Sequence, residues 1–212
     1  MKQTRIKICG ITTPEMAQVA VRAGADYLGL VFAPRSPRVL IRDRAVEILD
    51  GLPKSVMGIP LFQNADPDDP VFRELCVRCG CVQLHGEESE AMIDTLPERM
   101  TIIRGFKFSP SETKRWDNCK GVTHLLIDGS SGGGGNSFDY DALIAMKDEI
   151  TKPIFLAGGL TPKNVEQAIR AVRPFAVDVS SGVEDPPGSG LKSPELIWSF
   201  CDAVRKADQE AN

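Results

Sequence analysis

The hydrophobic pattern of the chain alternates between two periods along most of its length. Short runs of β-branched and aliphatic residues, typical of buried strands, lead into loops that contain Gly, Pro or Asp. Each loop is followed by a stretch with the apolar spacing of an amphipathic helix. The strand starts recur about every 20 to 30 residues, the length of one strand-loop-helix unit. The expected strands are Arg5–Ile8, Tyr27–Phe32, Ser55–Leu61, Cys81–Leu84, Thr101–Phe106, Thr123–Ile127, Pro153–Leu156 and Phe175–Val179.

Helical stretches fill the intervals between these strands. Thr161-Pro162 and Ser193-Pro194 provide typical helix starts, and Gly24 ends the first helix. The weakest helical pattern lies at Ser111–Asn118, where Trp116 is the only large apolar residue. The other expected helices are Pro14–Ala23, Arg42–Leu49, Pro70–Val77, Ser89–Leu96, Tyr140–Ile150, Asn164–Val172 and Pro194–Lys206.

Eight strands alternating with helices indicate a parallel β-barrel with the helices outside. An open, doubly wound sheet is the alternative. Against it, no G-x-G-x-x-G sequence follows the first strand, and the unusual loops follow many strands instead of one switch point. With 212 residues, against about 250 in a common barrel of this kind, we expect one compact domain over residues 1–212.

Composition narrows the partners that this domain could have. A net charge of −4 gives no reason to expect nucleic acid or an acidic membrane surface as a partner. No apolar run is long enough for a signal peptide or a membrane span, so we expect a cytoplasmic protein. The helices show no surplus apolar face, which makes a monomer the default and a homodimer the alternative.

The 6 cysteines allow two interpretations. The spacing of Cys76, Cys79 and Cys81 is that of half a zinc site, for which Cys119 could supply a fourth ligand. The second paired motif of a zinc framework is missing, and a cytosolic chain of this length rarely carries disulfides. We therefore interpret these thiols as core packing and predict no metal.

The first strand delivers a thiol to the carboxyl end of the predicted barrel, where chemistry gathers in this fold. Side chains alternate along a strand, so Lys7 and Cys9 share one face, and the lysine can favour the thiolate. In a closed barrel the eighth strand pairs with the first. We therefore expect Lys7 to pair with Asp178 beneath the site and to orient Cys9.

Other strand ends add candidate chemistry. Asp128 ends the sixth strand and could act with Cys9 as an acid and base pair across the mouth of the barrel. Gln83 and His85 share one face at the end of the fourth strand, where the histidine either serves the site or satisfies a backbone carbonyl. His124, at the opposite end of the sixth strand, is interpreted as structural.

Two consecutive loops predict a phosphate site. Glycine lets backbone N–H groups approach an anion closely, and loops after the seventh and eighth strands hold phosphate in many barrels. The loop after the second strand carries Arg38 between prolines and apolar residues. The predicted phosphate-binding residues are Gly158, Gly159, Ser180, Ser181 and Gly182.

Seven motifs, in order and nearly from end to end, resemble the phosphoribosylanthranilate isomerase family. That resemblance implies a (β/α)8 TIM barrel in tryptophan biosynthesis that needs no metal or organic cofactor. Its substrate would be a phosphosugar joined to anthranilate, converted by an Amadori rearrangement into a deoxyribulose phosphate. The motifs are Lys7–Thr12, Gly29–Phe32, Ser36–Arg38, Val82–Gly86, Leu126–Asp128, Ala157–Leu160 and Val177–Glu184.

The resemblance also implies roles. Cys9 matches the family's general base, Asp128 its general acid, and Arg38 the arginine that holds the anthranilate carboxylate. The glycine loop after the seventh strand and Ser180–Gly182 match the phosphate grip. Gln83, His85 and Asp178 are expected to bind the substrate.

Two segments depart from the family sequence. The loop 129–139 has four consecutive glycines and lacks the usual lysine and first threonine, and the tail 186–192 lacks the usual lysine-aspartate ending. Two alternatives stay open. A histidine-pathway isomerase on the same barrel would be expected to use two aspartates, and a silent barrel would not need Cys9, Arg38 and Asp128 together.

Overall fold

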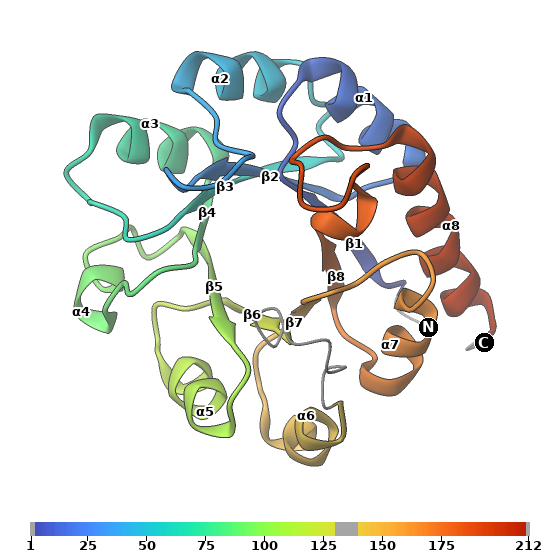
Figure 1. Cartoon of the computed structure of the whole chain (residues 1–212). Coiled ribbons are helices and arrows are strands. Elements are labelled where there is room, and N and C mark those ends of the chain that lie inside the picture. The colour runs from blue at the N-terminus through green and yellow to red at the C-terminus, as the bar shows by residue number, and fades with distance from the viewer. Residues whose placement is uncertain (1–2, 130–139, 211–212) are drawn as a thin grey trace.

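The structure of this chain, a computed structural model, describes residues 3–129 and 140–210. Eight parallel strands close into a barrel in which each strand pairs with the next and the last pairs with the first. Figure 1 looks into this barrel and shows the helices arranged around it. The (β/α)8 barrel predicted from the sequence is thus confirmed. The strands are β1 (Arg5–Cys9), β2 (Tyr27–Phe32), β3 (Met57–Phe62), β4 (Cys81–Leu84), β5 (Thr101–Lys107), β6 (His124–Asp128), β7 (Ile154–Ala157) and β8 (Ala176–Val179).

The helices begin where the sequence provides caps. Thr13 Oγ1 accepts a hydrogen bond from Met16 N at the start of the first helix, and Gly24 ends it with a left-handed backbone. Two short 3₁₀ helices, η1 (Lys147–Glu149) and η2 (Ser181–Val183), complete the set. The α-helices are α1 (Pro14–Ala23), α2 (Arg42–Asp50), α3 (Pro70–Cys79), α4 (Glu90–Ile93), α5 (Pro110–Asn118), α6 (Tyr140–Met146), α7 (Val165–Val172) and α8 (Pro194–Glu210).

Two helix predictions were too long and one weak prediction was right. The helix predicted over 89–96 stops at Ile93, because the next residues form tight turns, such as Thr95 N to Met92 O, just before Pro97. The helix predicted over 140–150 changes to 3₁₀ geometry after Met146. In contrast, α5 forms as expected, with Trp116 only 1% exposed.

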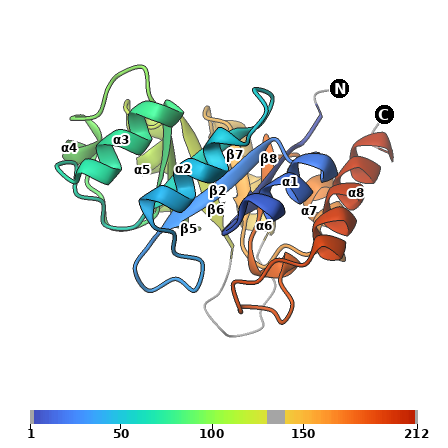
Figure 2. The ribbon, with the colours of Figure 1, turned by 90° about the horizontal axis from the view of Figure 1, so that it is seen from above.

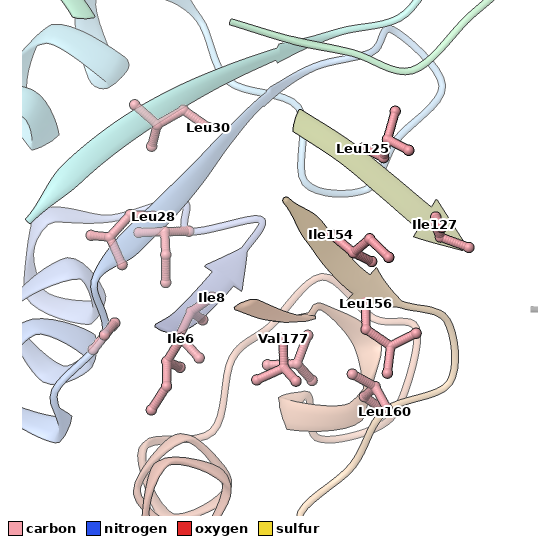
Figure 3. Close-up of a cluster of buried hydrophobic side chains, with 14 of the residues drawn as sticks. Ile6, Ile8, Leu28, Leu30, Leu125, Ile127, Ile154, Leu156, Leu160 and Val177 are labelled. Carbon is pink, nitrogen blue, oxygen red and sulfur yellow. The ribbon is translucent and has the colours of Figure 1, made fainter. Parts of the chain in front are cut away.

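Alternation along the strands builds two apolar regions. Side chains that point outward, such as Ile6, Ile8 and Leu28, pack between the strands and the helices, as Figure 3 shows. Side chains that point inward fill the barrel interior in its lower part. The interior residues include Ile59, Cys81, Ile103, Leu126, Phe155 and Ala176. The barrel is therefore a packed core below and leaves room only near the carboxyl ends of the strands.

The two ends of the barrel differ in their connections. In Figure 2 the loop after β2 and the loop before α8 extend to one side, whereas both termini lie on the other. Thr4 near the amino terminus bonds Asp208 of α8 through its backbone N–H and its hydroxyl, at 2.8 and 2.7 Å. The termini are thus tied together at the end opposite to the long loops.

The cysteine cluster packs in the way that the sequence favoured. Cys76 and Cys81 are buried, Cys79 is half-buried, and Cys81 Sγ donates to the Gly58 carbonyl at 3.4 Å. Burial raises the pKa of the Cys76 thiol to about 12. Within residues 3–129 and 140–210 no group of His, Cys, Asp or Glu is arranged to hold a metal ion. In the same residues, no helix is long and apolar enough to cross a membrane.

Candidate active site

A cavity of about 370 Å³ opens at the carboxyl ends of the strands. Every one of the predicted site residues contributes to its wall, although these residues come from six different places in the sequence. Val31, Leu61 and Leu126 add apolar surface to its wall. The predicted residues that line the cavity are Cys9, Arg38, Gln83, His85, Asp128, Gly158, Gly159, Asp178, Ser180, Ser181 and Gly182.

Cys9 ends β1 in the wall of the cavity and is 6% exposed. A Cβ atom built on Gly29 of the neighbouring strand would lie 2.7 Å from Cys9 Sγ, so only glycine leaves room for the sulfur there. Burial raises the pKa of the Cys9 thiol, and the opposing influence of Lys7 and Lys192 only reduces that rise. As expected, Lys7 lowers the pKa of Cys9 and so favours the thiolate, but desolvation raises this pKa by more.

Beneath Cys9, Lys7 and Asp178 form a buried ion pair. The two residues are in direct register between β1 and β8, and Lys7 Nζ lies 2.9 Å from Asp178 Oδ1. Lys7 is 0% and Asp178 8% exposed. Burial by itself lowers the pKa of Lys7, but Asp178 and Cys9 more than offset it, so the ammonium stays charged. The predicted pairing beneath the site is confirmed.

Arg38 reaches the cavity from the loop after β2 and is held by a carboxylate that the sequence patterns did not single out. Its Nε and Nη2 donate to the two oxygens of Glu184 at 2.5 and 2.7 Å. A Cβ atom on Gly10 would lie 2.4 Å from Arg38 Cδ, so the arginine stem crosses this glycine closely. Lys192 Nζ donates to the same carboxylate at 2.7 Å.

Glu184 therefore joins two loops through charge-assisted hydrogen bonds. The backbone N–H groups of Gly188 and Gly190 also donate to its Oε2. Burial alone would raise the pKa of Glu184, but the bonds from Arg38 and Lys192 bring it down to about 2. The carboxylate is ionised at neutral pH and neutralised by the two cations beside it.

Lys192 also reaches the predicted phosphate loops. Its Nζ donates to the Ser180 carbonyl at 3.0 Å, and the Ser180 hydroxyl lies 3.4 Å away. Gly158 and Gly159 both have left-handed backbones, with φ of 95° and 64°. A Cβ atom on Gly182 would lie 1.8 Å from the Leu160 carbonyl, so the backbones after β7 and β8 touch there. Only glycine at position 182 permits this contact.

Gln83 and His85 extend inward from β4. Gln83 is 1% exposed, and its Nε2 lies 3.1 Å from His85 Nδ1. Asp128 ends β6, which is separated from β1 by β7 and β8 around the ring. At the opposite end of the same strand, the His124 ring packs near Phe155 with centroids 5.6 Å apart, in agreement with a structural role. The glycine-rich loop predicted over 129–139 lies, from residue 130 on, outside the described residues.

Comparison with known proteins places this chain in a family. A family model described as N-(5'-phosphoribosyl)anthranilate (PRA) isomerase matches residues 6–203. This chain belongs to the phosphoribosylanthranilate isomerase family. It is accordingly an isomerase of tryptophan biosynthesis.

Three relatives illustrate the match. The N-(5'-phosphoribosyl)anthranilate isomerase of Geotalea uraniireducens is 41% identical over 202 residues, which are 93% of this chain and 96% of the relative. A phosphoribosylanthranilate isomerase in complex with reduced 1-(o-carboxyphenylamino)-1-deoxyribulose 5-phosphate has a TM-score of 0.83 at 36% identity, over 96% of this chain and 100% of that chain. Engineered monomers of the dimeric enzyme from Thermotoga maritima match with a TM-score of 0.82 at 35% identity, over the same shares.

Two residues of this family member escaped prediction from the sequence. Glu184 ends one of the motifs that carry the resemblance, but the motif alone indicates no partner for it. Lys192 lies in the tail 186–192, which departs from the family sequence, yet its side chain is 1% exposed and contacts both Glu184 and Ser180. The one sequence feature that could have indicated a role for Lys192 is its position just before the helix cap Ser193.

Proposed function

We propose that this chain isomerises N-(5'-phosphoribosyl)anthranilate with Asp128 as general acid and Cys9 as general base. The observation that carries the proposal is a single cavity into which β1 brings a thiol and β6 a carboxyl group. The cavity is large enough for a ligand of this size, since ligand pockets span roughly 300 to 1,000 Å³. The product-analogue complex of the related isomerase supports the same substrate class.

The reaction needs two proton transfers at neighbouring atoms. Asp128 gives a proton to the ring oxygen of the ribose, which opens the ring and leaves a Schiff base at C1. Cys9, as the thiolate, removes the proton from C2, and the resulting enolamine becomes the ketone. Each transfer by a positioned group contributes on the order of 10²- to 10⁴-fold to the rate. To become the ketone, the enolamine gains a proton at C1 and loses the proton of its C2 hydroxyl, and because electrons move only within the substrate, no oxidant or reductant is needed.

The ends of the substrate are assigned to separate groups of the cavity. The phosphate binds the backbone after β7 and β8, at Gly158–Gly159 and Ser180–Gly182, where left-handed glycines and a short 3₁₀ helix allow N–H groups to approach an anion. Lys192 adds a positive charge beside Ser180. Arg38 holds the anthranilate carboxylate through Nη1, because Glu184 accepts from its Nε and Nη2. Gln83, His85 and Asp178 face the part of the substrate between these ends.

The cellular setting remains a prediction from the sequence. A cytoplasmic location and a small-molecule substrate, without nucleic acid or membrane partners, agree with the net charge of −4. The default monomer competes with a homodimer, and the related Thermotoga maritima enzyme is described as dimeric. Sedimentation of the purified chain distinguishes the two.

The decrease of anthranilate-type fluorescence on adding substrate measures the proposed reaction. We expect Cys9→Ala and Asp128→Asn each to lower kcat/KM by about 10² to 10⁴. Matched controls are Cys79→Ala and Asp94→Asn, which make the same chemical changes outside the cavity and are expected to leave kcat/KM within twofold. Equal rates in wild type, Cys9→Ala and Asp128→Asn would refute the assigned roles.

A further inference from the structure

Gln83 is a buried polar residue whose two amide atoms have different surroundings. Its Nε2 lies 3.1 Å from His85 Nδ1, whereas its Oε1 has no hydrogen-bond partner among the residues that the structure describes. A buried acceptor without a partner destabilises a fold, and leucine would fill a similar volume without one. Packing therefore does not explain a glutamine at this position in the cavity wall, whereas its polar contact with His85 gives it a role there.

The contact determines which His85 nitrogen carries the proton. The amide Nε2 of Gln83 can only donate, so His85 Nδ1 must accept through its lone pair. In the neutral ring the proton then resides on Nε2. Burial lowers the pKa of His85 and outweighs Asp128 and Asp178, which raise it, while Lys7 and Arg104 lower it further. The ring is neutral at pH 7.

A glycine on the next strand determines where this ring lies. A Cβ atom built on Gly105 would be 2.3 Å from His85 Nδ1 and 2.9 Å from its Cε1. The imidazole thus rests directly on the backbone of β5, which pairs with β4 on one side and with β6 on the other. Asp128 ends β6 and lines the same cavity as His85, and its charge raises the pKa of His85. Gly105 lets the side chain that follows β4 lie over β5, on the side of the proposed acid.

A neutral N–H donor is suited to some parts of the ligand and not to others. An uncharged donor beside a carboxyl group suits an uncharged oxygen, since the anionic ends of the substrate have Arg38, Lys192 and the glycine loops. The pentose supplies such oxygens. We infer that Gln83 is a positioning residue that holds His85 in its Nε2-protonated form, and that this N–H binds a pentose oxygen beside Asp128. The inference rests on the proposed function, which supplies the pentose.

Nitrogen-15 NMR of the histidine side chains measures the tautomer directly. The chain has 2 histidines, so His85 is the only one left in a His124→Asn variant. In that protein at pH 7 we expect an unprotonated Nδ1 and a protonated Nε2. Replacement of Gln83 by glutamate, a group that only accepts, should move the proton to Nδ1 and raise the pKa of His85. A protonated Nδ1 with Gln83 intact would overturn the inference.

Steady-state kinetics then tests whether this tautomer matters for the reaction. We expect Gln83→Leu to lower kcat/KM about tenfold without lowering the melting temperature, because the variant removes a buried unpaired acceptor. The matched control is Gln18→Leu, which loses a hydrogen bond to Gly51 O on the surface and should keep wild-type kinetics. Inactive wild-type protein would refute the proposed function. Active wild type with unchanged kcat/KM in Gln83→Leu would refute this inference alone.

Discussion

Cys9 combines two opposing demands in one side chain. Its burial in a slot above Gly29 fixes the sulfur in the cavity wall but raises the pKa of the thiol. A thiolate with a raised pKa is the stronger base, although less of it is present at neutral pH. Lys7 and Lys192 limit this rise in the pKa of Cys9. Lys7 lies beneath Cys9 on the same strand, and Lys192 belongs to the loop before α8.

The titration of this thiol should follow from its burial. Because burial raises the pKa of Cys9 above the usual value of about 8.5, the thiolate fraction of the free protein should rise about tenfold per pH unit up to that pKa. The difference in thiolate absorbance between wild type and Cys9→Ala measures this titration. A Cys9 thiolate signal that is already complete below pH 8 would contradict this expectation.

Individual residues were predictable from the sequence where strand alternation alone decides their position. Lys7 and Asp178 follow from the closure of β8 onto β1, and their register is the one expected. Glu184 and Lys192 were not predictable, because their contact depends on the path of the loop between β8 and α8. The slots at Gly29 and Gly105 also depend on side-chain directions that no local pattern encodes.

At the scale of elements, Glu184 connects the loops after β2 and β8. The bonds from Arg38 and Lys192 meet at one carboxylate that is 1% exposed, so neither loop can move without breaking charged contacts. The proposed phosphate loops are fixed in a similar way by the contact of Gly182 with the Leu160 carbonyl. The cavity end of the barrel is thus assembled by contacts between loops as well as within them.

Acid unfolding tests the contribution of Glu184. Its pKa is about 2 in the folded chain and about 4.3 when unfolded, so its stabilisation is complete above pH 4.3 and disappears as the pH falls to 2. We expect Glu184→Gln to lower the free energy of unfolding by about 3 kcal/mol at pH 7. In urea titrations this difference should shrink between pH 4.3 and 2.

The matched control for this experiment is Glu195→Gln, on the surface at the start of α8. Its effect on the free energy of unfolding should stay below about 0.5 kcal/mol, the range usual for surface substitutions. A difference between wild type and Glu184→Gln that does not change with pH would argue against an ionised carboxylate as the cause.

Element boundaries show what a sequence pattern leaves undetermined. The periodicity located all eight strands, with β3 displaced by two residues at its start and one at its end. Helices α4 and α6 were predicted too long because caps and apolar spacing do not reveal where the last turn changes to tighter geometry. The turns before Pro97 and the 3₁₀ turn after Met146 depend on packing that forms only in the complete barrel.

For the whole molecule, the Lys7–Asp178 pair lies where the barrel closes. It joins the first strand to the last at the base of the cavity, with Lys7 fully buried and Asp178 8% exposed. Desolvation of two charges offsets much of their attraction, so such a pair stabilises little by itself. The main effect of the pair is on the candidate site, because it places a cation under Cys9 and an anion beside the cavity.

A double-mutant cycle separates these contributions. Lys7→Met leaves Asp178 buried without a counter-charge and should lower the free energy of unfolding by about 3 to 5 kcal/mol. The double variant Lys7→Met/Asp178→Leu should recover most of that loss in urea titrations, yet remain impaired in kcat/KM. Arg5→Met, which breaks the exposed Arg5–Asp26 pair on the same strand, should change stability by less than about 1 kcal/mol. Full recovery of kcat/KM in the double variant would restrict the pair to a structural role.

The packed interior of the barrel also determines how ligands enter and leave the cavity. Ile59, Ile103, Leu126 and Phe155 fill the space below the ion pair, so a molecule in the cavity has no exit through the axis. The product must leave through the mouth of the cavity, by which the substrate entered. Accumulated product should therefore compete with fresh substrate for the cavity.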